Sequence, residues 1–399
     1  MKNVMYVLAL GTIVLAMGCR KTGCTDPAAT NYSVEAKKDD GSCEYDLQVP
    51  STYAFTDENG NSTVSYNGQE QRLEMLSEIV TYMKTADVAG TALTASTLLD
   101  MYANNAYTWT DAGSLGMTGS SKQLKSKTAG GDIGVQAMFA AYMDTLATIS
   151  ASTVVSQEDG AAGVAGVWPN DGQKGPYLMD GNGKEYTQLI EKGLMCAVFM
   201  NQMTDNYLAG LSSDDNTVAV DAAAGKYYTE MEHHWDEAYG YFTDAIDYPA
   251  NGTDRFWGKY ANGRESLLSS ATLISTAFRT GRTAIVNSDY EGRDAQVTII
   301  FNEMERVAAG TAIHYLNDAK TYIADNTARN HVLSEAYAFL DGMRYGANAV
   351  NATGMTSAQI DTALAYFSAD FNLVTLGDIQ NAIDLIAANT GLESVKGDL

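Results

Sequence analysis

Proline is scarce in this chain of 399 residues. There are five prolines, and none of them lies between positions 51 and 168 or after position 249. Proline is unfavourable inside a helix because it has no backbone N–H and clashes with the preceding turn. Two long stretches therefore lack the strongest helix breaker, and the sequence predicts an all-α fold before any periodicity is counted.

Positive charge is scarce as well. The chain has 25 Lys and Arg residues against 49 Asp and Glu residues, which gives a formal net charge of -24. A strongly acidic surface repels phosphate backbones, so we expect no nucleic-acid partner. Hydrophobic residues make up 45% of the chain, which is enough for a large core and argues against a disordered protein.

A long hydrophobic run occurs only at the start of the chain. The apolar residues 4–17 follow a single basic residue, as in a secretory signal peptide, and are too few for a stable transmembrane helix. The run ends in LAMGC at positions 15–19, which resembles the lipobox of bacterial lipoproteins. The resemblance implies a signal peptide over 1–18 and a lipidated Cys19. The alternative is an ordinary signal peptide cleaved near the same place.

The lipobox resemblance also implies a location. It places the protein in the cell envelope of a Gram-negative bacterium, held at a membrane by its acyl chains. Arg20 follows the cysteine where an inner-membrane lipoprotein would carry aspartate, which favours the outer membrane or the cell surface. We therefore expect the membrane as one partner, and an unknown small ligand or envelope protein as another.

Cysteine is rare, and two of the four cysteines bound one short segment. The segment reads GCTDPAATNY over 23–32 and AKKDDGSCEY over 36–45. It resembles a small cysteine-bounded module of bacterial surface proteins. The resemblance implies that Cys24 and Cys43 pair in an oxidising compartment. We expect residues 19–46 to form a spacer between the membrane and the body.

Three aspartates of this module are candidate calcium ligands. Asp26, Asp39 and Asp40 carry the oxygen atoms that calcium prefers. The alternative is that these residues form turns and carry solvated charge, as aspartate commonly does in loops.

The body, residues 47–399, is predicted to be a helical bundle that opens with a small hairpin. Asn59 and Gly60 lie between the β-prone runs 53–55 and 63–66, which is the strongest short hairpin signal. Apolar residues then recur at spacings of three and four, the pattern of amphipathic helices. The expected helices are 69–85, 132–150, 184–209, 226–247, 264–286, 289–324, 328–346, 357–368 and 377–388.

Long loops are expected between these helices. The longest are 104–131, 156–183, 210–225 and 247–263. Loops of this length are uncommon in a compact domain and are often functional. The aromatic residues within 102–109 and 256–260 could line a binding face. Two up-down sets of helices, 69–210 and 226–389, suggest a pseudo-duplicated bundle.

Histidine is also rare, and two of the four histidines are adjacent. In a helix over 226–247, spacings of three and four place Glu230, His234 and Glu237 on one face. One imidazole and two carboxylates in a row form a ligand set suited to zinc or iron. Metal sites of helical bundles are built from such pairs on facing helices.

The run HHWDEA at 233–238 matches the His-x-x-Glu core of imelysin-like proteins. Those proteins are helical bundles in bacterial lipoproteins or periplasmic proteins; some are linked to iron uptake, and others were proposed as metallopeptidases. The segments VPSTY at 49–53 and YTQLIEKGLM at 186–195 are similar to an uncharacterised imelysin-like lipoprotein family. The resemblance implies an imelysin-like up-down bundle in which His234 and Glu237 bind metal.

A purely structural interpretation of this helix stays open. Glu230 can form a solvent-exposed ion pair with Lys226 one turn away. The histidines can lie at the rim of the bundle, hydrogen-bonded to loops. A metal site would also need ligands from other helices. The candidates are Glu74, Glu78, His314, His331 and Glu335.

Catalytic motifs are absent from the sequence. Neither His-Glu-x-x-His nor Gly-x-Ser-x-Gly occurs, which argues against the common zinc peptidase and α/β-hydrolase arrangements. Cys196 lies in an apolar run and is expected to be a buried, inert thiol. We therefore expect binding of a metal ion or small ligand, as an accessory to iron uptake, rather than catalysis. A structural or interaction lipoprotein is the alternative, and a metallopeptidase is a weaker one.

Overall fold

The computed structural model describes residues 21–27, 29–44, 46–111, 115–156, 160–170, 173–250 and 254–399. The chain divides into two compact units, the first ending at Gln48 and the second running from Val49 to Leu399. The signal peptide and the lipidated Cys19 that the sequence predicts lie outside the described residues. Within those residues, no helix has the length and apolar character needed to cross a membrane.

The first unit is closed by a disulfide bond. Cys24 and Cys43, which are 19 positions apart, are joined as the sequence resemblance implies, so this pairing is confirmed. Thr22 and Lys38 form an isolated parallel bridge, and the other described residues of the unit lie in turns, bends and irregular segments. The disulfide therefore holds together a segment with little regular structure.

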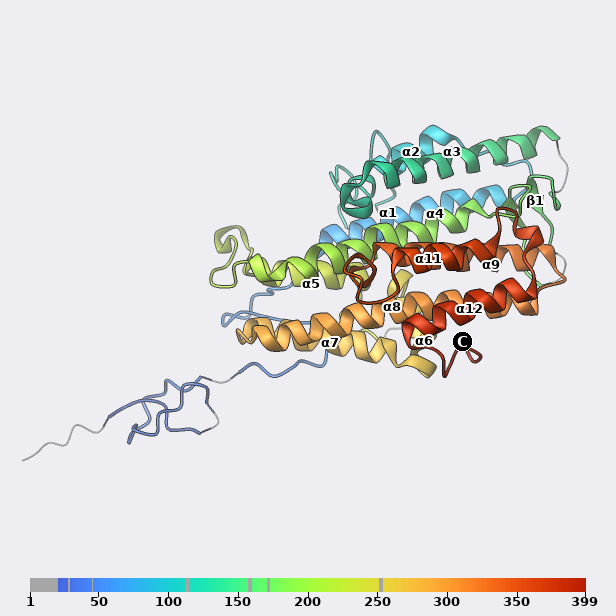
Figure 1. The fold of residues 1–399 in the computed structure, drawn as a ribbon. Helices are drawn as coiled ribbons and strands as arrows, with labels where there is room; N and C mark the ends of the chain where they lie inside the picture. The colour runs from blue at the N-terminus through green and yellow to red at the C-terminus, as the bar shows by residue number, and fades with distance from the viewer. Residues whose placement is uncertain are drawn as a thin grey trace, which may run out of the picture. The chain divides into compact units, whose positions relative to one another are not determined.

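The second unit is a bundle of helices, which confirms the all-α prediction (Figure 1). Its α-helices are α1 (Asn67–Lys84), α2 (Ala95–Ala103), α3 (Ile133–Ser156), α4 (Tyr186–Leu194), α5 (Glu230–Phe242), α6 (Phe256–Leu268), α7 (Ser270–Val286), α8 (Tyr290–Thr321), α9 (Asn326–Gly342), α10 (Ala347–Val350), α11 (Ser357–Leu364) and α12 (Leu376–Thr390). Short 3-10 segments are η1 (Thr85–Asp87), η3 (Lys125–Gly131), η6 (Leu211–Ser213), η7 (Ala222–Ala224), η8 (Met343–Tyr345), η9 (Ala365–Phe367) and η10 (Phe371–Leu373).

The longest helix, α8, packs against α7, α9 and α12, and α4 packs against α9. These helices run side by side across the view of Figure 1. On the other side of the bundle, α1 contacts both α4 and α5, while α3 contacts α2 and α4. The side chains discussed below come from α1, α4, α5 and α6, from η3 and the loop before it, and from the π-helical continuation of α4.

The helix that begins as α4 continues into two π-helical segments, η4 (Met195–Met200) and η5 (Gln202–Leu208). All of η4 is buried, as the sequence predicts for a central helix. A π-helical turn holds an extra residue and is frequent at functional sites. Here it carries polar groups into the core: Asn201 donates to the carbonyl of Tyr345 at 3.1 Å. Cys196 is fully buried beside this turn, as expected for an inert thiol.

The hairpin expected near residue 60 is a turn with one isolated bridge rather than a pair of strands. Thr56 and Ser62 form an antiparallel bridge, and the N–H of Thr63 donates to the carbonyl of Phe55 at 3.0 Å. Tyr53 and Phe55 are buried. Their burial fixes this segment against the bundle without the strand pairing that a hairpin would need.

Two predictions about loops are wrong. The loop expected over 156–183 contains a small sheet, in which β1 (Gly166–Trp168) pairs antiparallel with β2 (Tyr177–Met179). The loop expected over 247–263 includes the start of α6, which ends at Ser269 with a φ of 56°. Glycine and asparagine in this stretch masked the helical spacing of Trp257 and Ala261, which are both fully buried.

Candidate functional site

The three residues predicted to share a metal ion have three different partners. Glu230 accepts a hydrogen bond from the N–H of Asp215 at 3.2 Å. Nδ1 of His234 lies 2.8 Å from a carboxylate oxygen of Asp214. Within the described residues, no group of three His, Cys, Asp or Glu side chains is arranged to hold a metal ion. The side-chain positions therefore do not fit zinc or iron, and the metal site remains a prediction that they do not support.

The additional ligands considered for that metal are engaged elsewhere. Glu74 pairs with Arg255 at 2.6 Å, and Glu78 accepts a hydrogen bond from the Tyr107 hydroxyl at 2.7 Å. His314 lies 4.0 Å from a carboxylate oxygen of Asp318 one turn away. The pair of His331 and Glu335 is buried in a separate cluster of charges that is described below.

The three aspartates that are predicted to bind calcium make local contacts typical of turns. Asp39 accepts the N–H of Gly41 at 3.1 Å, and Asp40 accepts the N–H of Ser42 at 3.1 Å. The backbone carbonyl of Asp26 accepts a backbone N–H three residues further on at 3.1 Å. These contacts describe turns, and calcium binding by the module stays a prediction.

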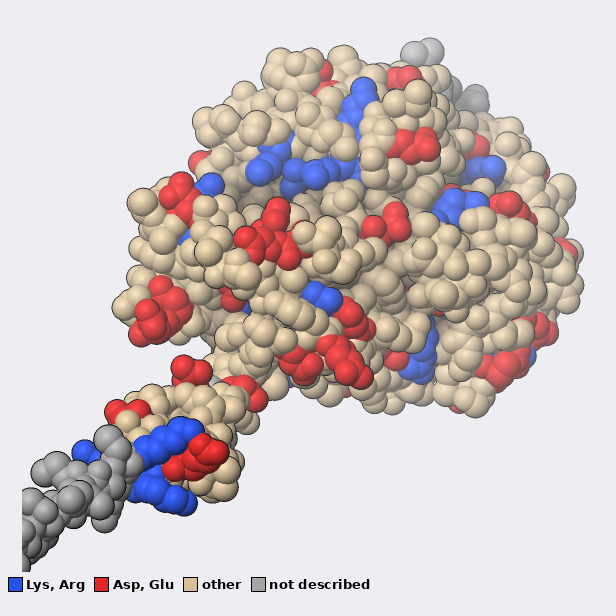
Figure 2. Space-filling view, turned by 60° about the vertical axis from the view of Figure 1, so that its left-hand side comes forward, with Lys and Arg blue, Asp and Glu red and all other residues tan. Residues whose placement is uncertain are grey.

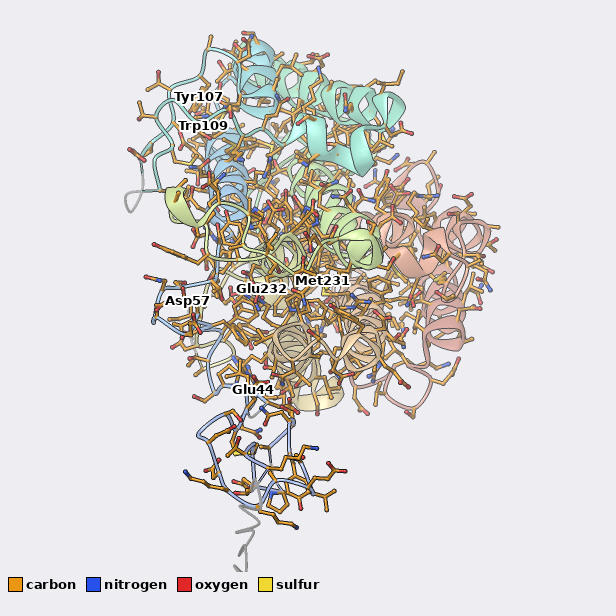
Figure 3. All side chains as sticks on the ribbon, turned by 90° about the vertical axis from the view of Figure 1, so that its left-hand side faces the viewer. Glu44, Asp57, Tyr107, Trp109, Met231 and Glu232 are labelled. Carbon is orange, nitrogen blue, oxygen red and sulfur yellow. A yellow bond between two sulfur atoms is a disulfide. The ribbon has the colours of Figure 1, made fainter. Side chains whose placement is uncertain are left out.

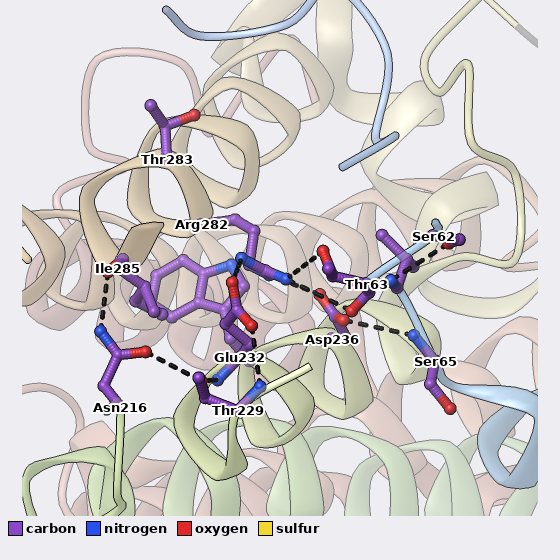
Figure 4. Close-up of polar contacts among 12 residues, drawn as sticks. Ser62, Thr63, Ser65, Asn216, Thr229, Glu232, Asp236, Arg282, Thr283 and Ile285 are labelled. Atoms are coloured by element: carbon purple, nitrogen blue, oxygen red, sulfur yellow. Dashed lines mark hydrogen bonds and ion pairs between the residues drawn. The ribbon is translucent and has the colours of Figure 1, made fainter. Parts of the chain in front are cut away.

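The inward face of α5 carries a buried ion-pair network (Figure 4). Arg282 of α7 is fully buried; it donates to Glu232 at 2.6 Å and to Asp236 at 3.0 Å. It also donates to the Thr63 hydroxyl at 3.0 Å, and the Tyr53 hydroxyl donates to Asp236 at 2.7 Å. Burial raises the pKa of Asp236 to about 6, although Arg282 opposes the shift. This network fastens the segment before α1 to α5 and α7, which is a structural role.

Glu237 lies in a different environment, which we call the Glu237 cluster. The side chain of Gln69 on α1 donates to Glu237 at 2.8 Å and to the Tyr207 hydroxyl at 3.4 Å. Nε2 of His233 lies 3.9 Å from the same carboxylate, and the ring of Tyr207 stacks near that of Tyr241 with centroids 6.2 Å apart. Members of the cluster are Gln69, Arg72, Lys122, Lys127, Tyr207, His233, Glu237 and Tyr241.

One buried polar atom of the Glu237 cluster, Oε1 of Gln69, has no hydrogen bond. The Tyr241 hydroxyl interacts with the side chain of Arg72, and the His233 ring interacts with the backbone of Ser65. Gln69 and Tyr241 are 1% and 0% exposed, so bulk solvent does not reach these side chains. An unsatisfied buried polar group costs roughly 1–3 kcal/mol. Oε1 of Gln69 therefore provides free hydrogen-bonding capacity for a ligand.

The cluster is also a local concentration of positive charge. The pKa of Lys127 is lowered by burial and by the charges of Arg72 and Lys122, while Glu237 opposes the shift. Lys122 extends over Gly68 of α1, where a Cβ atom would meet the lysine Cε at 3.0 Å. Figure 2 shows several Lys and Arg side chains lying next to one another in the upper part of the body, while other Lys and Arg side chains and the Asp and Glu side chains are spread over the same face.

Arg72 is held in place by carbonyl groups. Its Nε donates to the carbonyl of Gln123 at 3.1 Å, and Nη1 donates to the carbonyl of Gly68 at 3.1 Å. Within the described residues, none of the ion pairs at 4.0 Å or less involves Arg72, Lys122 or Lys127. None of the three side chains is therefore held in an ion pair of this length, and each can contact another partner.

Sequence reasoning found Glu237 but missed the cationic part of this cluster. Gln69 and Arg72 lie on an ordinary amphipathic helix, where nothing marks them as functional. A signal did exist in the following loop, because Lys122, Lys125 and Lys127 fall within six positions of a chain whose net charge is -24.

Both aromatic segments singled out in the sequence border cavities. Tyr107 and Trp109, labelled in Figure 3, line a cavity of about 260 Å³. Their rings pack edge to face, with centroids 4.8 Å apart. Phe256 and Tyr260 line a second cavity of about 410 Å³ beside α1 and α4.

Comparison with known proteins places the chain in a family without naming a ligand. Neither the curated proteins nor the solved structures gave a match. A family model matches residues 50–393, which include the Glu237 cluster and the Arg282 network. The chain therefore belongs to the family described as "Domain of unknown function (DUF4856)".

Proposed function

We propose that this protein is a lipid-anchored component of the bacterial cell envelope whose helical body binds a small anionic ligand at the Glu237 cluster. The observation that carries the proposal is the grouping of three cations, Arg72, Lys122 and Lys127, around a cluster in which the buried Oε1 of Gln69 has no hydrogen bond. The lipobox-like LAMGC at 15–19 and the disulfide-closed spacer support the location. A role as an accessory to uptake follows from that location.

The charges favour an anion over a metal ion. Arg72, Lys122 and Lys127 would repel a divalent cation near Glu237, whereas a carboxylate or phosphate group would gain charge-assisted hydrogen bonds from them. Hydrogen bonds to charged groups contribute about 1.5–3 kcal/mol each. Three cations in one cluster can therefore select an anion even on an acidic protein.

The neutral side chains of the Glu237 cluster place a second requirement on the ligand. Gln69 donates to Glu237 through Nε2, which leaves its buried Oε1 as an acceptor without a donor. A ligand that fits both parts carries an acidic group and at least one hydroxyl or amino donor. Small hydroxy acids and phosphorylated sugars belong to this class.

Isothermal titration of the full chain with citrate and with inorganic phosphate tests the proposal. We expect the wild type to bind at least one of the two probes, and Lys127→Gln to weaken that binding by tenfold or more. Lys125→Gln is the matched control, because Lys125 is exposed on the same segment but is not a member of the cluster. It should bind like the wild type.

Two results would overturn the proposal. One is the absence of binding for both probes, and the other is equal binding by wild type and Lys127→Gln. Elemental analysis of the untagged protein is the companion measurement, since stoichiometric zinc or iron would favour the metal hypothesis instead.

A further inference from the structure

We infer a second binding site, for a neutral, hydroxyl-rich ligand such as a sugar, in the cavity between α1, α4 and α6. This site does not depend on the function proposed above. The cavity has a volume of about 410 Å³, within the range of roughly 300–1,000 Å³ typical of small-molecule sites. Its lining residues are Ser77, Val80, Glu191, Asp254, Arg255, Phe256, Lys259 and Tyr260, none of which belongs to the Glu237 cluster.

The charges on the cavity wall neutralise one another. Arg255 pairs with Glu74 at 2.6 Å and with Asp244 at 2.9 Å. Glu191 pairs with Lys192 at 2.7 Å, and Nζ of Lys84 lies 3.8 Å from its second oxygen. The other two charged residues of the wall, Asp254 and Lys259, are of opposite sign, so the wall offers many polar groups but little net attraction for an ion.

Glu191 is held rigidly by a chain of buried charges that leads away from the cavity. Nζ of Lys192, which forms the ion pair with Glu191, also lies 3.7 Å from a carboxylate oxygen of Glu335. Glu335 lies 3.4 Å from Nε2 of His331, whose Nδ1 lies 2.6 Å from Glu185. All five side chains belong to residues that are at most 9% exposed. Burying such ions is expensive unless they are paired, so the chain fixes each member in one position.

One oxygen of Glu191 remains available. Oε1 accepts from Lys192, but Oε2 is buried and has no hydrogen bond. The nearby Lys84 is too distant at 3.8 Å to donate one. A ligand hydroxyl in the cavity can donate to Oε2 and complete its hydrogen bonding. The carboxylate thus presents a preorganised acceptor rather than an unbalanced charge.

Val80, Phe256 and Tyr260 add apolar and aromatic surface to the wall. Phe256 has a φ of 47°, a strained conformation for a residue with a side chain, and such strain clusters at ligand sites. Lys259 extends over the ring of Tyr260 at 5.8 Å from its centroid. A sugar presents C–H groups on its faces and hydroxyls on its rim. Aromatic rings beside balanced charges therefore match both parts of such a ligand.

Saturation-transfer NMR of the full chain with glucose, galactose, N-acetylglucosamine, maltose and lactose tests this site. We expect transfer to at least one of these sugars, and a loss of tenfold or more in Glu191→Gln, which keeps the shape of the side chain. Lys226→Ala, an exposed lysine away from the cavity, should leave the signal unchanged.

Two further variants distinguish a loss of sugar binding from a loss of folding, and this site from the anion site. If Glu191→Gln fails to fold, Lys259→Ala tests the site in its place, because Lys259 is exposed and its truncation leaves no cavity in the core. Lys127→Gln should keep full sugar binding, which distinguishes this site from the anion site. Absence of transfer to every sugar, or undiminished transfer in the folded cavity variants, would overturn the inference.

Discussion

The guanidinium of Arg282 lies 2.6 Å from the carboxylate of Glu232, and the arginine side chain is completely buried. This contact joins α7 to the first turn of α5. Asp236, also fully buried, accepts from the same guanidinium at 3.0 Å. The sequence HHWDEA was interpreted through its second histidine and its glutamate, but the aspartate within it makes a fully buried contact with Arg282.

Arg282→Met should lower the free energy of unfolding by about 3–5 kcal/mol, because it leaves two buried carboxylates without their counter-ion. Urea denaturation followed by circular dichroism measures this change. Arg279→Met on the same helix is the control, since the hydrogen bond of Arg279 is to Thr276 at 3.4 Å. An equal loss in both variants would show that the ion-pair network has no special role.

Gly281→Ala should destabilise the bundle although alanine is the better helix former. A Cβ atom at Gly281 would lie 2.2 Å from the ring of Trp235, which is fully buried. Overpacking of this kind costs about 1–3 kcal/mol. Gly263→Ala on α6 is the matched control, because its Cβ would meet nothing within 4 Å.

The control variant Gly263→Ala should gain up to about 1 kcal/mol in free energy of unfolding from helix propensity alone. Thermal unfolding of the two variants is therefore expected to shift in opposite directions. Shifts of the same sign would contradict the close packing of α7 on α5.

The unfolding free energy of the body should fall as pH rises. Burial disfavours the charged form of His331, but the carboxylate of Glu185 outweighs it and raises the pKa of His331. A histidine with a raised folded pKa stabilises the fold below about pH 6.5, and that contribution is lost as pH rises through the folded value. Burial raises the pKa of Asp87 to about 7, so the folded state also holds that proton more tightly.

His331→Gln should therefore flatten the pH dependence above about pH 6.5. Asp87→Asn should flatten it at lower pH, because the proton on Asp87 is released between its unfolded pKa and about 7. Urea midpoints measured at a series of pH values test both expectations. Wild-type stability that rises over this range, or variants with the wild-type slope, would contradict them.

Replacing Cys24 and Cys43 together by serine should loosen the first unit and leave the body unchanged. The disulfide closes a loop of 19 positions, which corresponds to about 3 kcal/mol of stabilisation. Limited proteolysis should cut the variant within the first unit faster than the wild type. Because the two units are separately compact, the Tm of the body should stay the same; a clear fall would refute this independence.

Much of the bundle follows from spacing alone. Apolar periodicity located α8 and α12, and Gly391 ends α12 with a φ of 70°, as a C-cap glycine should. α6 was missed because its buried residues lie next to a loop rich in glycine and asparagine. The π-helical turn of η4 was missed because all of its residues are buried, and a fully apolar stretch carries no periodic signal.

The candidate site could be predicted only in part. Helical spacing correctly placed His234 and Glu237 on neighbouring turns of one helix. It could not identify their partners, because Gln69 lies 168 positions from Glu237 and Asp214 lies 20 positions from His234. A single sequence shows which residues share a helix face, whereas the neighbours of that face depend on how the helices pack.

The position of a few cations on a strongly acidic body has a kinetic consequence. At a distance, an approaching anion meets the field of the whole body, whose formal net charge is -24, and is repelled. Close to Arg72 and Lys127 it is attracted instead. Salt at 0.1 M screens charges beyond about 10 Å, so it weakens the distant repulsion more than the local attraction. Moderate ionic strength should thus speed the capture of an anion before higher ionic strength shortens its stay.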